Sequence, residues 1–366
     1  VYHPDYRRAE LTQAGRDRLK EMTSGPDMSV LWRGTRRREE TIEQALTGLL
    51  GFHLDVHYII RDGKVMIVDE NTGRVMPDRA WEKGLQQLIE VKENVGISPE
   101  KETLARISYQ LFFRRYLRLS GMTGTCREVA GELGEAYGLS VVRVHPRKPS
   151  LRIKHKSILK ADSQARWAAV IEAIDERTRA GQAVLVGTKS ILASEHLSSL
   201  LAERNIDHQV LNAKQDSAEA SLVARAGEAG AVTIATNMAG RGTDIKLSEA
   251  VKQAGGLHVI LTERHDNARV DRQLVGRCAR QGDPGSWQEI LSMEDDLLKN
   301  YHPAVTKRLK YAMQKHETSN VAQIIGLCWY RMAQLHEEKR QRQARASLLR
   351  FDFQNRRALS FSGQME

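Results

Sequence analysis

Short runs of apolar and β-branched residues alternate with helical patterns over residues 165–293, and this alternation constrains the fold more than any other feature. The apolar runs are Ala183–Thr188, Gln209–Leu211, Val232–Thr236, His258–Thr262 and Glu289–Ser292. Between them, apolar residues recur at helical spacing in Ala165–Ile174, Ile191–Leu201 and Ala218–Ala226, and again at Val270 and Leu274. Strands that alternate with helices form a parallel sheet covered by helices, so we expect an α/β domain here.

The segments upstream of this region follow other patterns. Val56–Ile60 and Val65–Val68 are two β-branched runs joined by a turn that contains Asp-Gly, which predicts a β-hairpin. The pattern predicts helices for Trp81–Lys92 and Thr103–Leu119, and a further strand for Val141–Val144.

The C-terminal segment combines a helical pattern with most of the net positive charge. From Ala304 to about Ser347 the pattern is helical, and a segment of that length must pack against another domain or a partner. The net charge of the chain is +10, and seven of those ten charges lie in Tyr301–Glu366. The excess suits an anionic partner such as nucleic acid, acidic lipid or acidic protein, or else belongs to a solvated helix face.

Length and composition exclude several classes of protein. A chain of 366 residues exceeds what one hydrophobic core usually holds, so we expect two or three domains. With 41% hydrophobic and 28% charged residues, it lacks the composition of a disordered protein. Cys126, Cys278 and Cys328 are odd in number and far apart, which argues against a zinc knuckle or disulfide framework and predicts a reducing compartment. Uncharged stretches such as Ala229–Gly240 are too short to span a bilayer.

The first cluster of candidate binding residues directly follows the run Val232–Thr236. Gly240 and Gly242 flank Arg241, so the backbone can approach a ligand closely there. Arg241 offers a rigid fork of hydrogen-bond donors, and Asp244 can accept hydrogen bonds from ribose hydroxyls. A tight turn with a surface salt bridge would use the same residue types, so this cluster alone does not identify a site.

The second cluster lies in Gln273–Asp283 and contains two arginines. If this segment is helical, Arg277 and Arg280 are spaced i,i+3 and share one face of the helix. Two guanidinium groups in that arrangement can clamp a phosphoryl group and neutralise the charge that develops during its transfer. Arginines at helical spacing are also common on solvated faces.

The two clusters, in this order within one α/β domain, resemble motifs V and VI of superfamily 2 ATPases. The segments 263–266 and 291–295 extend the match to the pattern TERHxxxRxDxQLxGRxxRQGDxGxxxxxLSxED. This long pattern resembles the SecA family, the ATPase motors of bacterial preprotein translocation. It is far more specific than a single glycine-rich turn.

The resemblance extends over nearly the whole chain and implies four parts. Residues 1–68 resemble the C-terminal part of a preprotein cross-linking domain, and residues 69–147 resemble the last part of a first nucleotide-binding lobe. Residues 148–303 would form a second lobe, a RecA-like parallel sheet with helices on both faces, and residues 304–366 would begin a helical scaffold domain.

Two short segments resemble coupling elements of the family. Residues 68–74 are similar to the family sequence VDEHTGR, with Asn71 in place of His, where the cross-linking domain rejoins the first lobe. Residues 120–125 resemble helicase motif III, which couples nucleotide state to lobe movement. The resemblance therefore implies a coupling role for Asp69, Glu70, Arg74, Thr123, Gly124 and Thr125.

The resemblance implies that ATP and Mg²⁺ bind between two lobes. Arg277 and Arg280 would be catalytic, contacting the γ-phosphoryl group when the lobes close. Nucleotide binding is implied for Gly240, Arg241, Gly242, Asp244 and Gln281. This sequence contains neither a GxxxxGK[ST] phosphate loop nor a Mg²⁺-binding carboxylate pair, so no metal ligand is assigned to it. We therefore expect the chain, whether a fragment or a shortened relative, to hydrolyse ATP negligibly by itself.

The same resemblance implies partners and a location. Unfolded preproteins, a SecYEG-type translocon and acidic phospholipid are the implied partners, at the cytoplasmic face of the bacterial plasma membrane, and a homodimer is allowed. One alternative is a superfamily 2 nucleic-acid helicase lobe. We do not expect a nucleic-acid partner, because aromatic residues are only 5% of the chain and are not interleaved with the basic runs. The other alternative is a non-catalytic module that docks on a translocon or anionic lipid through the positive tail.

Overall fold

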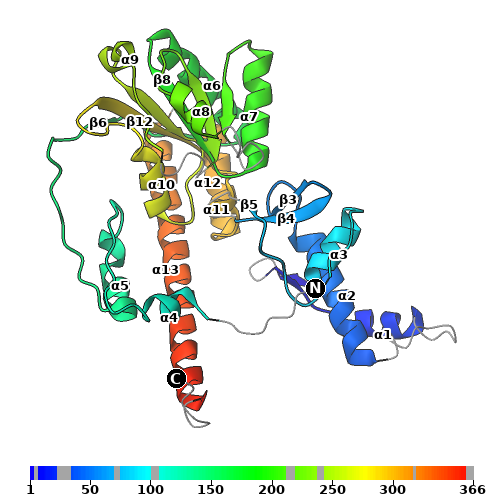
Figure 1. Ribbon diagram of the computed structural model, residues 1–366. Coiled ribbons are helices and arrows are strands. Elements are labelled where there is room, and N and C mark those ends of the chain that lie inside the picture. Colours follow the sequence, from blue (N-terminus) through cyan, green and yellow to red (C-terminus); the bar gives the residue numbers. More distant parts are fainter. Residues whose placement is uncertain are drawn as a thin grey trace. The chain divides into compact units, whose positions relative to one another are not determined.

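The structure of the chain is a computed structural model that describes residues 1–3, 7–22, 34–69, 75–99, 107–211, 219–236, 243–315 and 319–359. The chain divides into two compact units, which Figure 1 shows in sequence colours. The first unit holds the N-terminal 104 residues, and the second holds most of the residues after them. Each unit is described below by itself.

The second unit is built on a parallel sheet. In the described residues this sheet has seven strands, in the order β6-β12-β11-β8-β10-β9, with β7 paired to the end of β12. The strands are β6 (Leu151–Lys154), β7 (Ile158–Lys160), β8 (Ala183–Thr188), β9 (Gln209–Leu211), β10 (Val232–Thr236), β11 (Leu257–Leu261) and β12 (Pro284–Ser292). Every strand pair in it is parallel, which confirms the α/β fold expected from the sequence.

Helices cover both faces of this sheet (Figure 1). The core on one face joins α6 (Ser163–Arg179) and α7 (Ile191–Glu203) to alternate strand residues such as Val184 and Val186. The core on the other face joins the helices α8 (Glu219–Arg225), α9 (Glu249–Gln253) and α10 (Ala268–Val275) to residues such as Leu185. Strands β8, β10 and β11 are buried along their whole length, which explains why they are continuous apolar runs in the sequence.

A helical segment follows the last strand and packs beneath one edge of the sheet. It comprises α11 (Asp296–Lys299), α12 (Pro303–Lys315) and the long helix α13 (Asn320–Leu359). Gln323 of α13 pairs with the backbone of the edge strand β7, because its side-chain amide accepts from the Leu159 N–H at 2.9 Å and donates to the Leu159 carbonyl at 2.7 Å. Three residues further along α13, a Cβ on Gly326 would lie 2.4 Å from Leu159 Cδ2, so only glycine allows this close approach.

Of two predictions for residues 103–144, the helix is confirmed only in part and the strand is wrong. Residues 103–106 lie outside the described part of the chain, and in 107–119 the only helix is α4, Tyr109–Phe113. The residues after it, such as Tyr116 and Leu117, are exposed, and a helix without packing is marginal in water. Val141–Val144 is not a strand, since no described strand lies beside it to pair with its backbone. Between these segments lies helix α5, Ala130–Tyr137.

The first unit contains two small antiparallel sheets and three helices within its described residues. The elements are β1 (Tyr2–His3), β2 (Arg8–Ala9), α1 (Gln13–Met22), α2 (Thr35–Gly51), β3 (Tyr58–Arg61), β4 (Lys64–Val68), β5 (Val75–Met76) and α3 (Leu85–Lys92). The predicted hairpin is confirmed as β3 and β4, whose turn residues Asp62 and Gly63 have φ of 52° and 68°. Two left-handed residues are what a tight hairpin turn requires.

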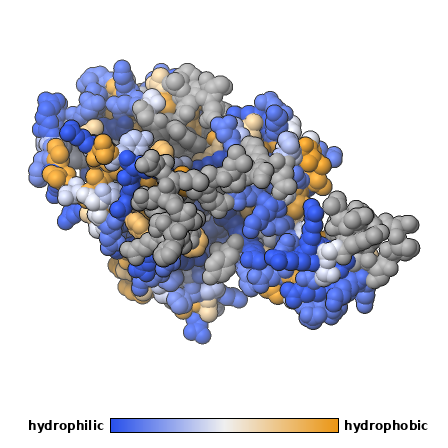
Figure 2. All heavy atoms as spheres, turned by 60° about the horizontal axis from the view of Figure 1, so that its bottom comes forward, coloured by the Kyte–Doolittle hydropathy of each residue, from blue (hydrophilic) through white to orange (hydrophobic). Residues whose placement is uncertain are grey.

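On the face of the molecule that Figure 2 shows, the described residues are mostly hydrophilic. None of the helices in the described ranges combines the length and apolar character that crossing a membrane requires.

Candidate nucleotide-binding site

The candidate site lies in the turn between helix α10 and β12, beside Asp244 of the segment that follows β10. This turn is at the amino edge of the parallel sheet, because Gly285 of β12 pairs with Leu257, the first residue of β11. Asp244 comes after β10, and α10 follows β11. Gly240, Arg241 and Gly242 from the first sequence cluster lie outside the described residues.

The second cluster is not helical, which corrects one premise of the sequence analysis. Helix α10 begins at Ala268, where the side chain of Asn267 accepts a hydrogen bond from the Arg269 N–H, and it ends at Val275. The chain must then turn back to enter β12 at Pro284, and it does so through left-handed residues at Ala279, Gln281 and Gly282. Arg277 and Arg280 therefore lie in this turn, which we call the arginine turn (residues 276–283), and not on one helical face.

The arginine turn nevertheless brings three of the predicted residues together. Arg280 Nη1 donates to Asp244 Oδ1 at 2.8 Å, and Gln281 Nε2 lies 3.4 Å from Asp244 Oδ2. Arg280 Nε also donates to the carbonyl oxygen of Gly276 at 3.0 Å, which fixes the plane of the guanidinium group. Arg277 precedes Arg280 in the same turn and is partly buried.

The ion pair between Arg280 and Asp244 is open to solvent. Their side chains are 40% and 42% exposed, and ion pairs at such positions stabilise a protein by about 0–1 kcal/mol. An anion could therefore replace the Asp244 carboxylate at Arg280 with little loss of stability. Guanidinium donors suit phosphate oxygens, so these residues fit a nucleotide phosphate.

The segment that resembles motif III lies against the outer side of α10. Thr125 N–H donates to Thr123 Oγ1 at 3.2 Å, which closes a turn around Gly124. Gln273 Nε2 of α10 lies 3.4 Å from Thr125 Oγ1, and Arg272 of α10 pairs with Glu128 at 2.7 Å. Thr123, Gly124 and Thr125 thus lie near the helix that leads into the arginine turn.

The remaining predicted coupling residues belong to the first unit. Asp69 directly follows β4 and is partly buried. Glu70 and Arg74 lie outside the described residues.

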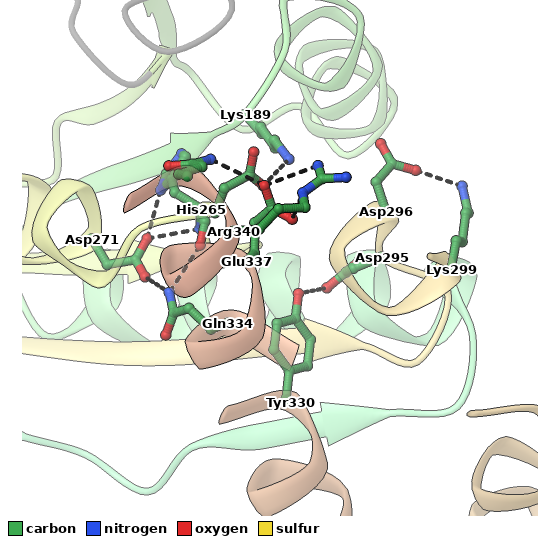
Figure 3. A network of polar contacts seen from close by, with 12 residues as sticks. Lys189, His265, Asp271, Asp295, Asp296, Lys299, Tyr330, Gln334, Glu337 and Arg340 are labelled. Carbon is green, nitrogen blue, oxygen red and sulfur yellow. Dashed lines mark hydrogen bonds and ion pairs between the residues drawn. The ribbon is translucent and has the colours of Figure 1, made fainter. Parts of the chain in front are cut away.

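The sequence analysis missed a buried polar network between the sheet edge and α13 (Figure 3). Asp271 of α10 accepts from His265 Nδ1 at 2.6 Å and from Gln334 Nε2 of α13 at 2.7 Å. The phenol of Tyr330, also on α13, donates to Asp295 Oδ2 at 2.7 Å. His265, Asp271 and Asp295 are positions of the family pattern, but the sequence does not show what they contact. Only the fold brings them to Tyr330 and Gln334 of α13.

Asp295 is the most perturbed acid in this network. Burial and the nearby carboxylate of Glu263 raise its pKa to about 7, although Arg166, which donates to Asp295 Oδ1 at 2.6 Å, acts in the opposite direction. Nearby, burial acts to lower the pKa of Lys189, but the ion pair with Asp266 at 3.0 Å holds that pKa above its ordinary value. The charges of this network are therefore paired rather than left alone in the interior.

Helix α13 also contacts α5. Arg345 donates to both carboxylate oxygens of Glu132, at 2.6 and 3.0 Å, and this hydrogen bonding lowers the pKa of Glu132. A bidentate pair of this kind fixes orientation as well as distance.

Metal ligands are not gathered anywhere in the part of the chain that the structure describes. No group of three or more His, Cys, Asp or Glu side chains there is arranged to hold a metal ion. The donors of the arginine turn suit phosphate oxygens, and the nearby carboxylate of Asp244 already contacts Arg280 and Gln281.

Two family models match the chain. The model of the SecA P-loop domain matches residues 149–252 and 246–320, and the model of the SecA preprotein cross-linking domain matches residues 2–90.

Curated relatives agree with these matches. The protein translocase subunit SecA 3 of Magnetococcus marinus is 57% identical over 356 residues, which cover 97% of this chain and 54% of the relative. The protein translocase subunit SecA 2 of Bordetella avium is 49% identical over 364 residues, which cover 99% of this chain and 54% of the relative. The chain thus spans about half the length of these relatives.

A comparison with solved structures gives only a weak likeness. The Escherichia coli DEAD-box protein SrmB, solved with the regulator RraA, is 19% identical, with a TM-score of 0.34 and coverage of 42% of this chain and 83% of that chain.

Proposed function

Because this chain belongs to the SecA family of protein translocase subunits, we propose that it supplies the second-lobe half of the ATP site in a protein-translocating motor. We call the complete motor a protein in which this chain is joined to a first lobe that carries a phosphate loop. In that motor, residues 148–303 are the second nucleotide-binding lobe, and residues 304–366 begin the scaffold.

One observation carries this proposal. Arg280, Asp244 and Gln281 meet at the turn that leads from α10 into β12, with Arg277 in the same turn. These residue types bind phosphate and ribose.

The contacts of Arg280 suggest how the site works. With the lobes apart, Asp244 and the Gly276 carbonyl hold the guanidinium group in place, so little conformational entropy is lost when it meets a ligand. When the lobes close, a γ-phosphoryl oxygen takes the place of Asp244 Oδ1 at Arg280, and Arg277 adds a second positive charge. The other oxygen, Asp244 Oδ2, lies 3.4 Å from Gln281 Nε2 and can accept from a ribose hydroxyl.

The remaining parts of the site would come from the first lobe. That lobe supplies the phosphate loop and the Mg²⁺ ligands, and Mg²⁺ neutralises phosphate charge when it is bound. Gly240, Arg241 and Gly242 would complete the nucleotide contacts from the second lobe.

Two segments would couple lobe closure to the rest of the motor. Thr123, Gly124 and Thr125 would report closure to α10, whose residue Gln273 contacts Thr125. Asp69, Glu70 and Arg74 would pass movement to the cross-linking domain, residues 1–68, which grips the polypeptide.

The proposed partners follow from the same role. They are unfolded preproteins, a SecYEG-type translocon and the acidic phospholipid of the inner face of the bacterial plasma membrane, and two copies of the motor can form a homodimer. The seven net positive charges of Tyr301–Glu366 support an anionic partner for the scaffold.

The role of the arginines is tested by Arg277→Ala in the complete motor. We expect turnover to fall by about 10³-fold, because an arginine that contacts the transferring phosphoryl group acts mainly in the transition state. Nucleotide affinity should change less than tenfold. Arg179→Ala, which removes an exposed arginine at the end of α6, is the matched control and should leave both quantities unchanged. Equal losses of affinity and turnover in Arg277→Ala would argue against the proposed role.

A further inference from the structure

Helix α10 connects the scaffold helix to the arginine turn. Its first residue, Ala268, contacts α13, and its last residue, Val275, is followed directly by the turn that carries Arg277 and Arg280. The helix is eight residues long, about 12 Å at the usual rise per residue. A displacement of the first turn of α10 is therefore transmitted to Arg277 and Arg280 through a short, rigid helix.

Gln334 of α13 binds the beginning of α10 from within the core. Its side-chain amide nitrogen donates to Asp271 Oδ2 at 2.7 Å and to the carbonyl oxygen of His265 at 2.9 Å, as Figure 3 shows for the labelled side chains. Gln334 is 2% exposed and Asp271 is 8% exposed, so water does not compete for these hydrogen bonds. Removing the amide would leave buried acceptors without this donor.

Glu338 lies one helical turn further along α13 and binds the same end of α10. Its carboxylate oxygen Oε1 accepts from the backbone N–H of Ala268 at 2.7 Å. The first N–H groups of a helix lack partners within the helix, and a negative charge there is favourable for the helix dipole. Gln334 and Glu338 thus act on the same helix end from adjacent turns of α13.

The C-terminal end of α10 is packed tightly enough to move together with its N-terminal end. Leu274 is 2% exposed, and a Cβ on Gly187 of β8 would lie 2.0 Å from its Cδ2. The N–H groups of Gly276 and Arg277 donate back to the carbonyls of Arg272 and Leu274, so the arginine turn continues the hydrogen bonding of the helix. The backbone between Ala268 and Arg277 therefore has little freedom to change its conformation.

We propose that Gln334 and Glu338 are positioning residues, which set the placement of Arg277 and Arg280 by holding the first turn of α10 against the scaffold helix. This inference rests on the proposed function only in that it takes the two arginines to contact a phosphoryl group. It makes the scaffold helix a regulator of ATP turnover, because a shift of α13 along the sheet moves the arginines through α10.

Hydrogen exchange on the full 366-residue chain tests the positioning independently of any activity. In Gln334→Ala and Glu338→Ala we expect the amides of Gly276, Arg277 and Cys278 to exchange about tenfold faster, because the turn loses its anchor. The amides of Val184–Thr188 in β8 should be unchanged. Gln343→Ala, an exposed glutamine on the same helix, is the matched control, and Glu338→Gln should retain protection because it keeps an oxygen acceptor. Unchanged exchange in the turn, or equally faster exchange in β8, would overturn the inference.

Turnover in the complete motor separates the inference from the proposed function. We expect Gln334→Ala to lower kcat about tenfold and to leave the KM for ATP within about twofold. When Gln334→Ala is combined with Arg277→Ala, kcat should be no lower than in Arg277→Ala alone, because both changes act on the contact of Arg277 with the phosphoryl group. Losses that multiply in the double variant would overturn the inference. If Arg277→Ala alone leaves turnover intact, the proposed function fails, whatever the exchange experiment shows about positioning.

Discussion

Single residues decide where the functional groups lie. Arg280, Asp244 and Gln281 could be chosen from the sequence because their chemistry suits phosphate and ribose. The C-terminal end of α10 could not be predicted from the sequence, because the helical spacing of Val270 and Leu274 continues toward Arg277. The chain leaves the helix because it must return to β12, and Gly285 of that strand lies so close to the arginine turn that a Cβ would be 2.6 Å from the Ala279 nitrogen. This constraint comes from tertiary packing.

His258 in β11 predicts how the stability of the second unit depends on pH. Its side chain is completely buried, and its Nδ1 contacts Ser286 Oγ at 2.7 Å. Burial lowers its pKa to about 3. The pKa of His258 in the folded state lies below its value of about 6.5 in the unfolded state. As the pH falls, the imidazole therefore binds a proton in the unfolded state before it does so in the folded state. We expect the free energy of unfolding to fall by about 2–3 kcal/mol from this residue between pH 6.5 and pH 4.5.

Denaturant unfolding at a series of pH values checks this prediction. His258→Asn should have a shallower dependence on pH than the parent chain in this window, even if its stability is lower overall. The exposed His145→Asn is the matched control and should keep the parent slope. If the free energy of unfolding of His258→Asn depended on pH as steeply as that of the parent chain, His258 would not be the cause of the pH dependence.

Whole elements were predictable where burial was complete. Strands β8 and β10 have the predicted bounds because both of their faces are covered, which leaves an unbroken apolar run. The short edge strand β6 was missed, since all four of its residues are exposed and carry no such run. The network of Asp271 and Gln334 was missed because the two residues are 63 positions apart and each looks like a solvent-facing residue of its own helix.

The contact between Gln323 and β7 predicts how α13 is attached to the sheet. Gln323→Ala leaves the N–H and carbonyl groups of Leu159 without their partner in the folded state. We expect a loss of about 1–3 kcal/mol in the stability of the second unit, because unpaired backbone groups near the core are costly. Thermal unfolding measures this loss, with Gln343→Ala as the control for a glutamine on the same helix. A melting temperature equal to that of the control would show that this contact does not anchor α13.

At the scale of the whole molecule, the chain combines parts of more than one domain. The α/β fold and the family were predictable because the pattern from Thr262 to Asp295 is long and specific. The two compact units and the attachment of α13 depend on contacts between distant residues, which no local pattern contains. The chain spans about half the length of its relatives. We propose that it supplies half of a nucleotide site, because its sequence contains no phosphate loop.

ATP hydrolysis by the purified chain, alone and after joining to a first lobe with a phosphate loop, tests this assignment most directly. We predict negligible turnover for the chain alone, because the phosphate loop is absent from its sequence. Joining the first lobe should produce turnover that Arg277→Ala lowers by about 10³-fold and that Arg179→Ala leaves unchanged. Ordinary turnover by the chain alone, or turnover in the joined protein that does not depend on Arg277, would contradict the account.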